Sequence, residues 1–318
     1  MTRSLLRTVF IAAAIVAAPS AMAKDKKLSP ENPPSKNFNL KKWNLTLPTD
    51  LDANSKADTI KQKYLIKGFE AEPFFHTADD GGMVFAAPIK GAKTSSNTSF
   101  TRSELREMLR NGNTDIKTKT KDGTPNKNNW VFSSAPTLAQ KRAGGVDGVM
   151  EATLAVNRVT VTGERHHIGR VIIGQIHAKD DEPIRLYYRK LPENENGSIY
   201  AAHESKNVKD DIYYEIIGTR SKSAPNPENG IALDEKFSYK IDAKGYNIFV
   251  TIYNDAGDVI GETTIDMTDS GYDVNDDYMY FKAGVYNQNK SGDPTDYVQA
   301  TFYKLNTSHD KYRKKKKS

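Results

Sequence analysis

Hydrophobic residues from Phe38 onward alternate with polar residues over short runs, and clusters of Gly, Asn, Asp and Pro separate these runs. In residues 246–253 the apolar Ile248, Val250 and Ile252 would share one face of a strand. The sequence Asn-Asp-Ala-Gly at 254–257 joins this run to the next, as in a β-hairpin. The same pattern predicts strands over residues 130–133, 148–156, 168–178, 184–190, 211–218, 237–241, 246–253, 258–265, 278–288 and 296–305.

Many short strands at this spacing are typical of a sandwich or a barrel, and no segment shows the long, capped pattern of a helix. The chain shows no internal repeat and no second core, so we predict an all-β fold with one domain over residues 37–306. Residues 24–36 are polar and rich in Pro, which indicates a linker. The polar stretches 111–129 and 191–210 are predicted to be long surface loops, which often form the walls of active sites.

Residues 1–23 have the pattern of a secretory signal peptide. Arg3 and Arg7 precede an apolar segment over residues 9–18, and the small residues near Ala23 suit a cleavage site. The apolar segment is shorter than the roughly 20 residues that span a bilayer. We therefore expect an exported protein, periplasmic or secreted, without a membrane anchor.

The net charge of +6 comes from the two ends of the chain. Arg3 and Arg7 belong to the predicted signal peptide, and residues 307–318 form a basic tail with six positive charges. Without the two charges of the signal peptide and the six of the tail, residues 24–310 carry a net charge of −2, which argues against a nucleic-acid partner. The tail is predicted to be a solvated, disordered end. The absence of Cys excludes disulfides, thiolate nucleophiles and Cys-based zinc sites.

Three predicted strands carry an unusual set of polar groups on one face. Period-two alternation places these residues on common faces: Arg102, Glu104 and Arg106; Gln175 and His177; and Tyr280, Lys282, Tyr286 and Gln288. Ile176, Phe281 and Val285 occupy the opposite faces and have the character of a core. If the strands are neighbours, their polar faces form a groove for an anionic, hydroxyl-rich ligand. Each pattern also has a simpler interpretation: a cross-strand ion-pair ladder, a half-exposed histidine and a tyrosine at a rim.

These segments resemble the signature blocks of polysaccharide lyase family 7, the alginate lyases. Residues 102–106 (RSELR) resemble the family's R-S/T-E-L-R block, and residues 175–177 (QIH) resemble its Q-I/V-H block. Residues 280–288 (YFKAGVYNQ) are similar to its C-terminal block, and residues 38–48 are similar to its opening strand. The four blocks occur in the family's order and span most of the predicted domain.

The resemblance implies a jelly-roll β-sandwich with a concave, polar active-site sheet. It implies cleavage of a (1→4)-linked uronate polymer by β-elimination, which leaves 4,5-unsaturated uronate ends. The catalytic positions that it implies are Arg102, Gln175, His177 and Tyr286. The substrate-binding positions that it implies are Glu104, Arg106, Lys282 and Gln288. No metal or organic cofactor is expected, and the expected partner of this monomer is the anionic polysaccharide alginate.

The chemistry of elimination independently requires these residue types. The proton at C5 of a uronate is weakly acidic, because the adjacent carboxylate cannot accept more negative charge. Arg102 and Gln175 would neutralise that carboxylate and stabilise the enolate-like transition state. Neutral His177 can act as the base near neutral pH. Tyr286, with an ordinary pKa of about 10, suits the acid that protonates the departing O4.

The stereochemistry of the substrate divides these roles. In guluronate H5 and O4 lie on opposite sides, which requires His177 as base and Tyr286 as acid. In mannuronate they lie on the same side, so Tyr286 could do both steps. As a base Tyr286 would need a lower pKa, for which Lys282 and Arg106 are candidates. The resemblance links Ile176, in place of Val, to guluronate, so we expect a preference for G or mixed MG blocks.

Other interpretations have less support in the sequence. In a strand the adjacent His166 and His167 would face opposite ways, so no metal site is predicted there. Asp211 and Glu215 share a strand face, as the carboxylates of a glycoside hydrolase might be arranged, but the clustered acidic motif of jelly-roll glucanases is absent. A non-catalytic carbohydrate-binding module would need the groove without the base and the acid.

Overall fold

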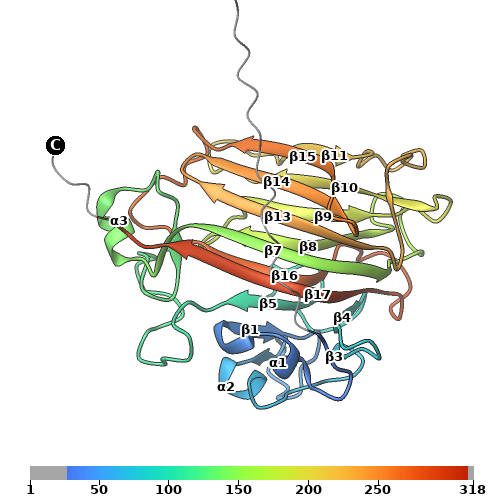
Figure 1. The fold of residues 1–318 in the computed structure, drawn as a ribbon, viewed down its shortest axis with the longest axis horizontal. Helices are drawn as coiled ribbons and strands as arrows, with labels where there is room; N and C mark the ends of the chain where they lie inside the picture. Colours follow the sequence, from blue (N-terminus) through green and yellow to red (C-terminus); the bar gives the residue numbers. More distant parts are fainter. Residues whose placement is uncertain (1–26, 314–318) are drawn as a thin grey trace, which may run out of the picture.

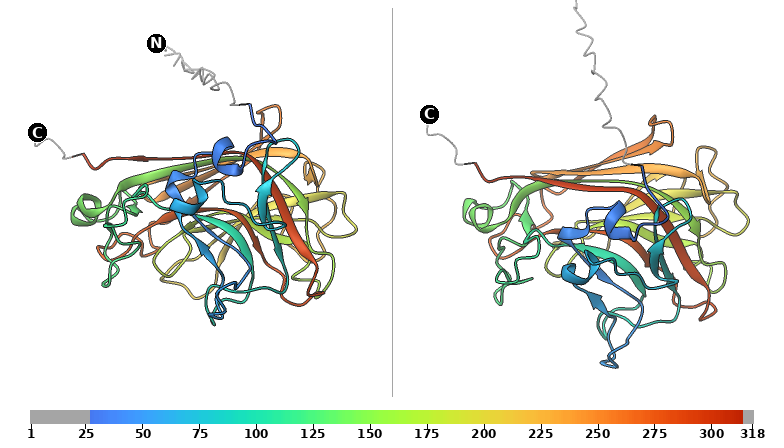
Figure 2. Two further views of the ribbon diagram at one scale, coloured as in Figure 1. Left: turned by 90° about the horizontal axis from the view of Figure 1, so that it is seen from below. Right: turned by 60° about the horizontal axis from the view of Figure 1, so that its bottom comes forward.

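The computed structural model describes residues 27–313, which form two stacked β-sheets (Figures 1 and 2). The strands of the first sheet are β1 Trp43–Thr46, β2 Thr59–Ile60, β5 Arg102–Glu107, β8 Arg170–His177, β9 Ile184–Arg189, β10 Asn196–His203, β11 Ile212–Ile217, β12 Ile231–Ala232 and β16 Tyr280–Asn287. Their order is β11-β10-β9-β8-β16-β5-β1-β2, and β12 pairs with β10. We refer to this layer as the site sheet.

The second sheet lies against the site sheet. Its strands are β3 Phe75–Thr77, β4 Met83–Pro88, β6 Trp130–Val131, β7 Gly145–Arg158, β13 Lys236–Lys244, β14 Asn247–Asn254, β15 Val259–Asp266 and β17 Tyr297–Asp310. Their order is β15-β14-β13-β7-β17-β4-β3, and β6 pairs with β7. This arrangement confirms the predicted all-β sandwich.

Helices are few and short in the described part of the chain. They are α1 Pro34–Asn37, the 3₁₀ helix η1 Leu40–Lys42, α2 Gln62–Leu65 and α3 Thr137–Arg142. Between residues 27 and 313, no helix has the length and the apolar character needed to cross a membrane.

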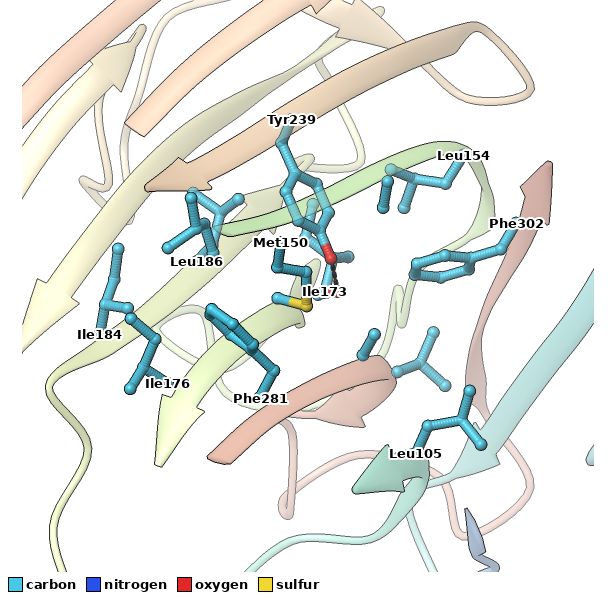
Figure 3. Packing of buried hydrophobic residues seen from close by; sticks show 14 of the residues in the cluster. Leu105, Met150, Leu154, Ile173, Ile176, Ile184, Leu186, Tyr239, Phe281 and Phe302 are labelled. Atoms are coloured by element: carbon cyan, nitrogen blue, oxygen red, sulfur yellow. Dashed lines mark hydrogen bonds between the residues drawn. The ribbon is translucent and has the colours of Figure 1, made fainter. Parts of the chain in front are cut away.

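The core lies between the two sheets, because alternation directs the apolar side chains of both layers inward. Ile173 and Phe281 of the site sheet meet Leu154 and Tyr239 of the second sheet (Figure 3). Burial of such a side chain stabilises the fold by about 1.5–3 kcal/mol. The Tyr239 hydroxyl donates a hydrogen bond of 3.0 Å to the Ile173 carbonyl, so its polar atom is satisfied within the core. The alternate residues of the site sheet point away from this core.

The predicted hairpin between β14 and β15 is confirmed. The two strands are antiparallel, and the Gly257 amide donates to the Asn254 carbonyl at 3.0 Å. The apolar residues Ile248, Val250 and Ile252 are all buried, as their shared strand face predicts.

Two predicted segments differ in the structure. Residues 191–210, predicted to be a loop, contain β10, whose later residues such as Ile199 and Tyr200 are buried against its neighbours. Residues 24–36, predicted to be a linker, include most of α1. The Asn37 side chain donates to the carbonyls of Ser29 and Gly81 at 2.8 and 2.9 Å, and these bonds fix the segment to the domain. Residues 111–129 lie outside the strands, as predicted.

The C-terminal boundary also differs, because β17 continues to Asp310. Its last residues, predicted to belong to the tail, contact the domain: Thr307 donates to Glu107, and the His309 Nε2 atom lies 3.1 Å from the same carboxylate. The predicted signal peptide and the end of the tail lie outside the described residues, so export stays a prediction.

Gly284 in the middle of β16 has a backbone conformation that favours glycine, with φ at +136°. It pairs with Glu104 of β5, and the pairing of β16 with β8 shifts register between Ala283 and Tyr286. A Cβ atom at Gly284 would lie 2.5 Å from the Ser103 carbonyl oxygen. The close approach of β5 and β16 therefore depends on the missing side chain.

We expect Gly284→Ala to lower the free energy of unfolding by at least about 1–3 kcal/mol, since it combines backbone strain with a steric clash. Gly245→Ala is the matched control: φ there is +60°, but the nearest atom to an added Cβ is 3.6 Å away. This control should lose only the roughly 1 kcal/mol of a left-handed alanine. Urea unfolding measures both, and equal losses would contradict the importance of the close approach.

Candidate active site

The three polar strands are neighbours in the site sheet, because β16 lies between β5 and β8. In register, Lys282 lies opposite both Gln175 and Arg106. Tyr280 lies opposite His177, and Tyr286 lies opposite Arg102. The condition left open by the sequence pattern, that the three strands be neighbours, is therefore met, and their polar side chains gather on one face.

A groove of about 520 Å³ runs over this face. The predicted site residues that line it are Arg102, Arg106, His177, Lys282 and Tyr286. The other lining residues are Thr46, Thr94, Asn97, Thr98, Ser99, Phe100, Asp180, Glu182 and Tyr280. Most of these additional residues belong to the loops before β5 and after β8, where no periodic pattern could have identified them.

Glu104 lies beneath the groove and joins three of the predicted site residues. Its buried carboxylate accepts a hydrogen bond from Arg102 Nη1 at 3.1 Å, and it also accepts hydrogen bonds from the Lys282 ammonium group and the Gln175 amide. Burial alone would raise the pKa of Glu104, but Lys282 and Arg102 hold it below its ordinary value. Neither Glu104 nor Gln175 lines the groove: Glu104 holds Arg102 and Lys282 from below, and Gln175 donates to Glu104.

Burial and the charge of Arg102 lower the pKa of Lys282 below its ordinary value, against the opposing effect of Glu104. Two cations meet one carboxylate, so the cluster of Arg102, Glu104 and Lys282 carries a net positive charge towards the groove. An anionic ligand can use this charge, since hydrogen bonds between ionised groups are the strong ones.

Tyr286 packs between Arg102 and Phe100. The guanidinium carbon of Arg102 lies 3.6 Å from the centre of the Tyr286 ring, and the Phe100 ring meets it edge-on at 6.1 Å. Burial raises the pKa of Tyr286, and Arg102 offsets only part of that effect. The lower pKa that Tyr286 would need in order to act as a base is not found, because desolvation of the phenol outweighs the attraction of nearby cations.

His177 has one ring nitrogen fixed and the other directed towards a carboxyl group. Its Nδ1 atom lies 2.7 Å from the Ala178 carbonyl oxygen, which can only accept a hydrogen bond. In the neutral ring Nδ1 therefore carries the proton, and Nε2 carries the lone pair. Burial, followed by the charge of Lys282, holds the pKa of His177 well below its usual range. The imidazole is thus neutral at neutral pH.

Among the lining residues that sequence reasoning missed, Glu182 lies beside His177. Its Oε1 atom lies 3.2 Å from His177 Nε2. Burial and a hydrogen bond with Glu204 raise the pKa of Glu182 to about 8, so the carboxyl group is largely protonated near neutral pH and can donate to Nε2. It follows His177 by five residues in the loop before β9, and nothing in the local pattern distinguishes it from the solvated carboxylates nearby.

Gln288 does not line the groove. It is buried just beyond the end of β16, and its amide nitrogen has a single long contact of 3.5 Å with the Asn287 carbonyl. Its backbone amide donates to the Arg170 carbonyl at 3.1 Å, which places it at the margin of the site.

Comparison of the sequence with known proteins identifies the family of this chain. The sequence model described as alginate lyase matches residues 38–309. An alginate lyase from Klebsiella pneumoniae is 55% identical over 289 residues, which cover 88% of this chain and 92% of the relative.

Solved structures agree with this match. The crystal structure of the alginate lyase from Klebsiella pneumoniae is 54% identical with a TM-score of 0.84, covering 87% of this chain and 98% of that one. An alginate lyase from Pseudomonas aeruginosa is 26% identical with a TM-score of 0.59, covering 85% and 99%. A family 7 alginate lyase in complex with a product is 23% identical with a TM-score of 0.61, covering 88% and 100%, a likeness that shows the jelly-roll fold alone. The match over most of the chain shows that this protein belongs to the alginate lyase family of polysaccharide lyases.

Proposed function

We propose that this protein cleaves alginate by β-elimination, leaving 4,5-unsaturated uronate ends, with a preference for G or MG blocks. The observation that carries the proposal is one groove in which an imidazole, a phenol and a guanidinium group, those of His177, Tyr286 and Arg102, line the same sheet face. The lowered pKa of His177 and the raised pKa of Tyr286 favour a neutral imidazole and a protonated phenol. The three groups are the base, the acid and the carboxylate-binding group that the elimination requires.

The first step is recognition of the uronate carboxylate. Arg102 reaches the groove, and its buried Nε atom has no hydrogen-bond partner among the described residues. The positive cluster around Glu104 would neutralise the carboxylate and stabilise the negative charge that develops when C5 loses its proton. One good donor in such a site stabilises the transition state by about 3–4 kcal/mol.

His177 would remove the proton from C5. The lone pair on Nε2 faces Glu182, so the H5 atom of a bound guluronate would take the place of that contact. The fixed Nδ1 hydrogen bond to Ala178 keeps the ring in the tautomer that a base needs.

Tyr286 would protonate the departing O4. Its raised pKa keeps the phenol protonated, which suits an acid and opposes the phenolate that mannuronate cleavage by Tyr286 alone would require. The division of labour between His177 and Tyr286 therefore supports guluronate-containing blocks as the preferred substrate.

We expect absorbance near 235 nm to rise when the purified protein acts on polyG or polyMG, and to rise more slowly on polyM. Only cleavage at guluronate can use His177 as the base and Tyr286 as the acid. Cleavage of polyM alone would refute the preference. New reducing ends without absorbance would indicate a hydrolase. Polymer binding without either would indicate a binding module.

We expect Tyr286→Phe to lower kcat on polyG by about 10²–10⁴-fold, the usual contribution of a general acid. Binding of guluronate oligomers, measured by calorimetry, should change little, because phenylalanine keeps the ring that packs on Arg102. Tyr246→Phe, at an exposed tyrosine of the turn before β14, is the control and should cleave at the normal rate. Normal turnover in the Tyr286 variant would exclude its role as the acid.

We expect Glu104→Gln to lower both stability and turnover. It leaves Arg102 and Lys282 beside each other without an anion, and breaking a buried pair on one side costs about 3–5 kcal/mol. Thermal unfolding and the 235 nm assay measure the two effects. Glu262→Gln, at an exposed position of β15, should change neither. An unchanged melting temperature for the Glu104 variant would show that the cluster does not stabilise the fold.

A further inference from the structure

Glu164, His166 and His167 meet in one turn of the loop between β7 and β8. Their ligand atoms all lie within 4.8 Å of one another. His166 Nε2 is 3.3 Å and His167 Nδ1 is 3.9 Å from the same oxygen of Glu164, and the two rings are 4.0 Å apart. The expectation that the two histidines face opposite ways is wrong, because this segment is not a strand.

The turn is built from backbone hydrogen bonds. The amides of His167 and Ile168 both donate to the Glu164 carbonyl, at 2.8 and 3.2 Å. This geometry resembles one turn of a helix, in which residues i and i+3 lie on the same side. The carboxylate of Glu164 therefore reaches the same space as the rings that follow it.

Neighbouring segments fix the loop in this shape. The Asp296 carboxylate accepts hydrogen bonds from the amides of Val161 and Thr162, at 2.8 and 3.0 Å. The Asn289 side chain donates to the Thr162 carbonyl at 2.8 Å, and the Glu164 amide donates to the Ser291 hydroxyl at 2.9 Å. The three side chains are thus presented by a backbone that is already ordered, which lowers the entropic cost of binding a ligand.

We propose that Glu164, His166 and His167 form a binding site for a divalent transition metal of the Zn²⁺, Ni²⁺ or Cu²⁺ class. Two imidazole nitrogens and one carboxylate oxygen are ligands that these ions prefer, whereas Ca²⁺ and Mg²⁺ need mainly oxygen ligands. Bonds of about 2.0–2.2 Å in a tetrahedral site place neighbouring ligand atoms about 3.4 Å apart. The separations of 3.3 and 3.9 Å from the Glu164 oxygen are close to this value, and the two imidazole nitrogens, which lie within 4.8 Å of each other, would move together on binding.

Nearby positive charges require that a cation be held by coordination bonds. Arg170 and Lys290 lie close enough to His167 to act on its charge and would repel any divalent cation, so imidazole coordination has to supply the binding energy. His167 Nδ1 also lies 3.0 Å from the Ser291 hydroxyl, so coordination through this atom replaces that contact. Imidazole coordination is strong enough for such an exchange, and water would complete the coordination sphere.

The site is distinct from the catalytic groove but adjoins it. None of its three residues lines the groove. The His167 ring meets Phe100 edge-on at 6.1 Å, and Phe100 lines the groove and contacts Tyr286. A bound metal would therefore fix the His167 ring behind one wall of the groove without entering it.

The test is a calorimetric titration of the purified protein, without a histidine tag, with Zn²⁺ at pH 7.5. We expect one ion per chain, and a loss of affinity of at least tenfold in both Glu164→Gln and His166→Ala. Both residues are exposed, so the variants should fold normally and cleave alginate at the normal rate without metal. His76→Ala, at a half-buried histidine of β3, is the matched control and should bind Zn²⁺ as tightly as the unaltered protein.

Electron paramagnetic resonance of the Cu²⁺-loaded protein gives an independent readout. Nitrogen hyperfine splitting from imidazole should be present and should weaken in His166→Ala. Absence of Zn²⁺ binding at millimolar concentration would overturn the proposal. Unchanged Zn²⁺ affinity in both His166→Ala and Glu164→Gln would also overturn it, since the ion would then bind elsewhere, for example at His177 and Glu182.

Discussion

The buried carboxylate of Glu104 is the interaction on which the site depends. It receives hydrogen bonds from β5, β8 and β16 at once, through Arg102, Gln175 and Lys282. A lone charge at this depth would be very costly, and two unneutralised cations would repel each other. Together they form a cluster with net positive charge, held rigidly below the groove. Gly284 makes this possible, since it lies opposite Glu104 in the ladder and leaves space for the backbone of β5.

The same alternation builds both the core and the site. Along β16, Phe281 and Val285 are buried between the sheets, while Lys282 and Tyr286 face the groove. A slip of one residue in register would exchange the two faces and place a lysine in the core. One pattern therefore determines both the stability of the sandwich and the placement of the polar groups in the groove, and the groove requires no separate scaffold.

Many of the strands could be predicted from the sequence, because the alternation of apolar and polar residues along a strand is a local property. It identified the strands around Arg102, Gln175 and Tyr286 and the polar face of each strand, whereas their position side by side in one sheet comes from the structure. The depth of each side chain could not be predicted: Glu104 and Arg102 alternate identically, yet one lies under the groove and the other lines it. Glu182 lies in a loop without a period, and the raised pKa of Tyr286 depends on burial by distant segments. Strand β10 was missed because its first residues are polar and Gly-rich, as in a loop.

The placement of the last two strands has a consequence for how the chain acquires its structure. Both β16 and β17 enter the middle of a sheet, between strands formed much earlier in the sequence, and Thr307 meets Glu107 from 200 residues away. Without residues 280–310 the strand that joins the two halves of each sheet is missing, the edges of those halves would be open, and Glu104 would lack Lys282. Such edges invite wrong pairing, and contacts so distant in sequence form slowly. Neither sheet can therefore close into one layer until residues 280–310 are available.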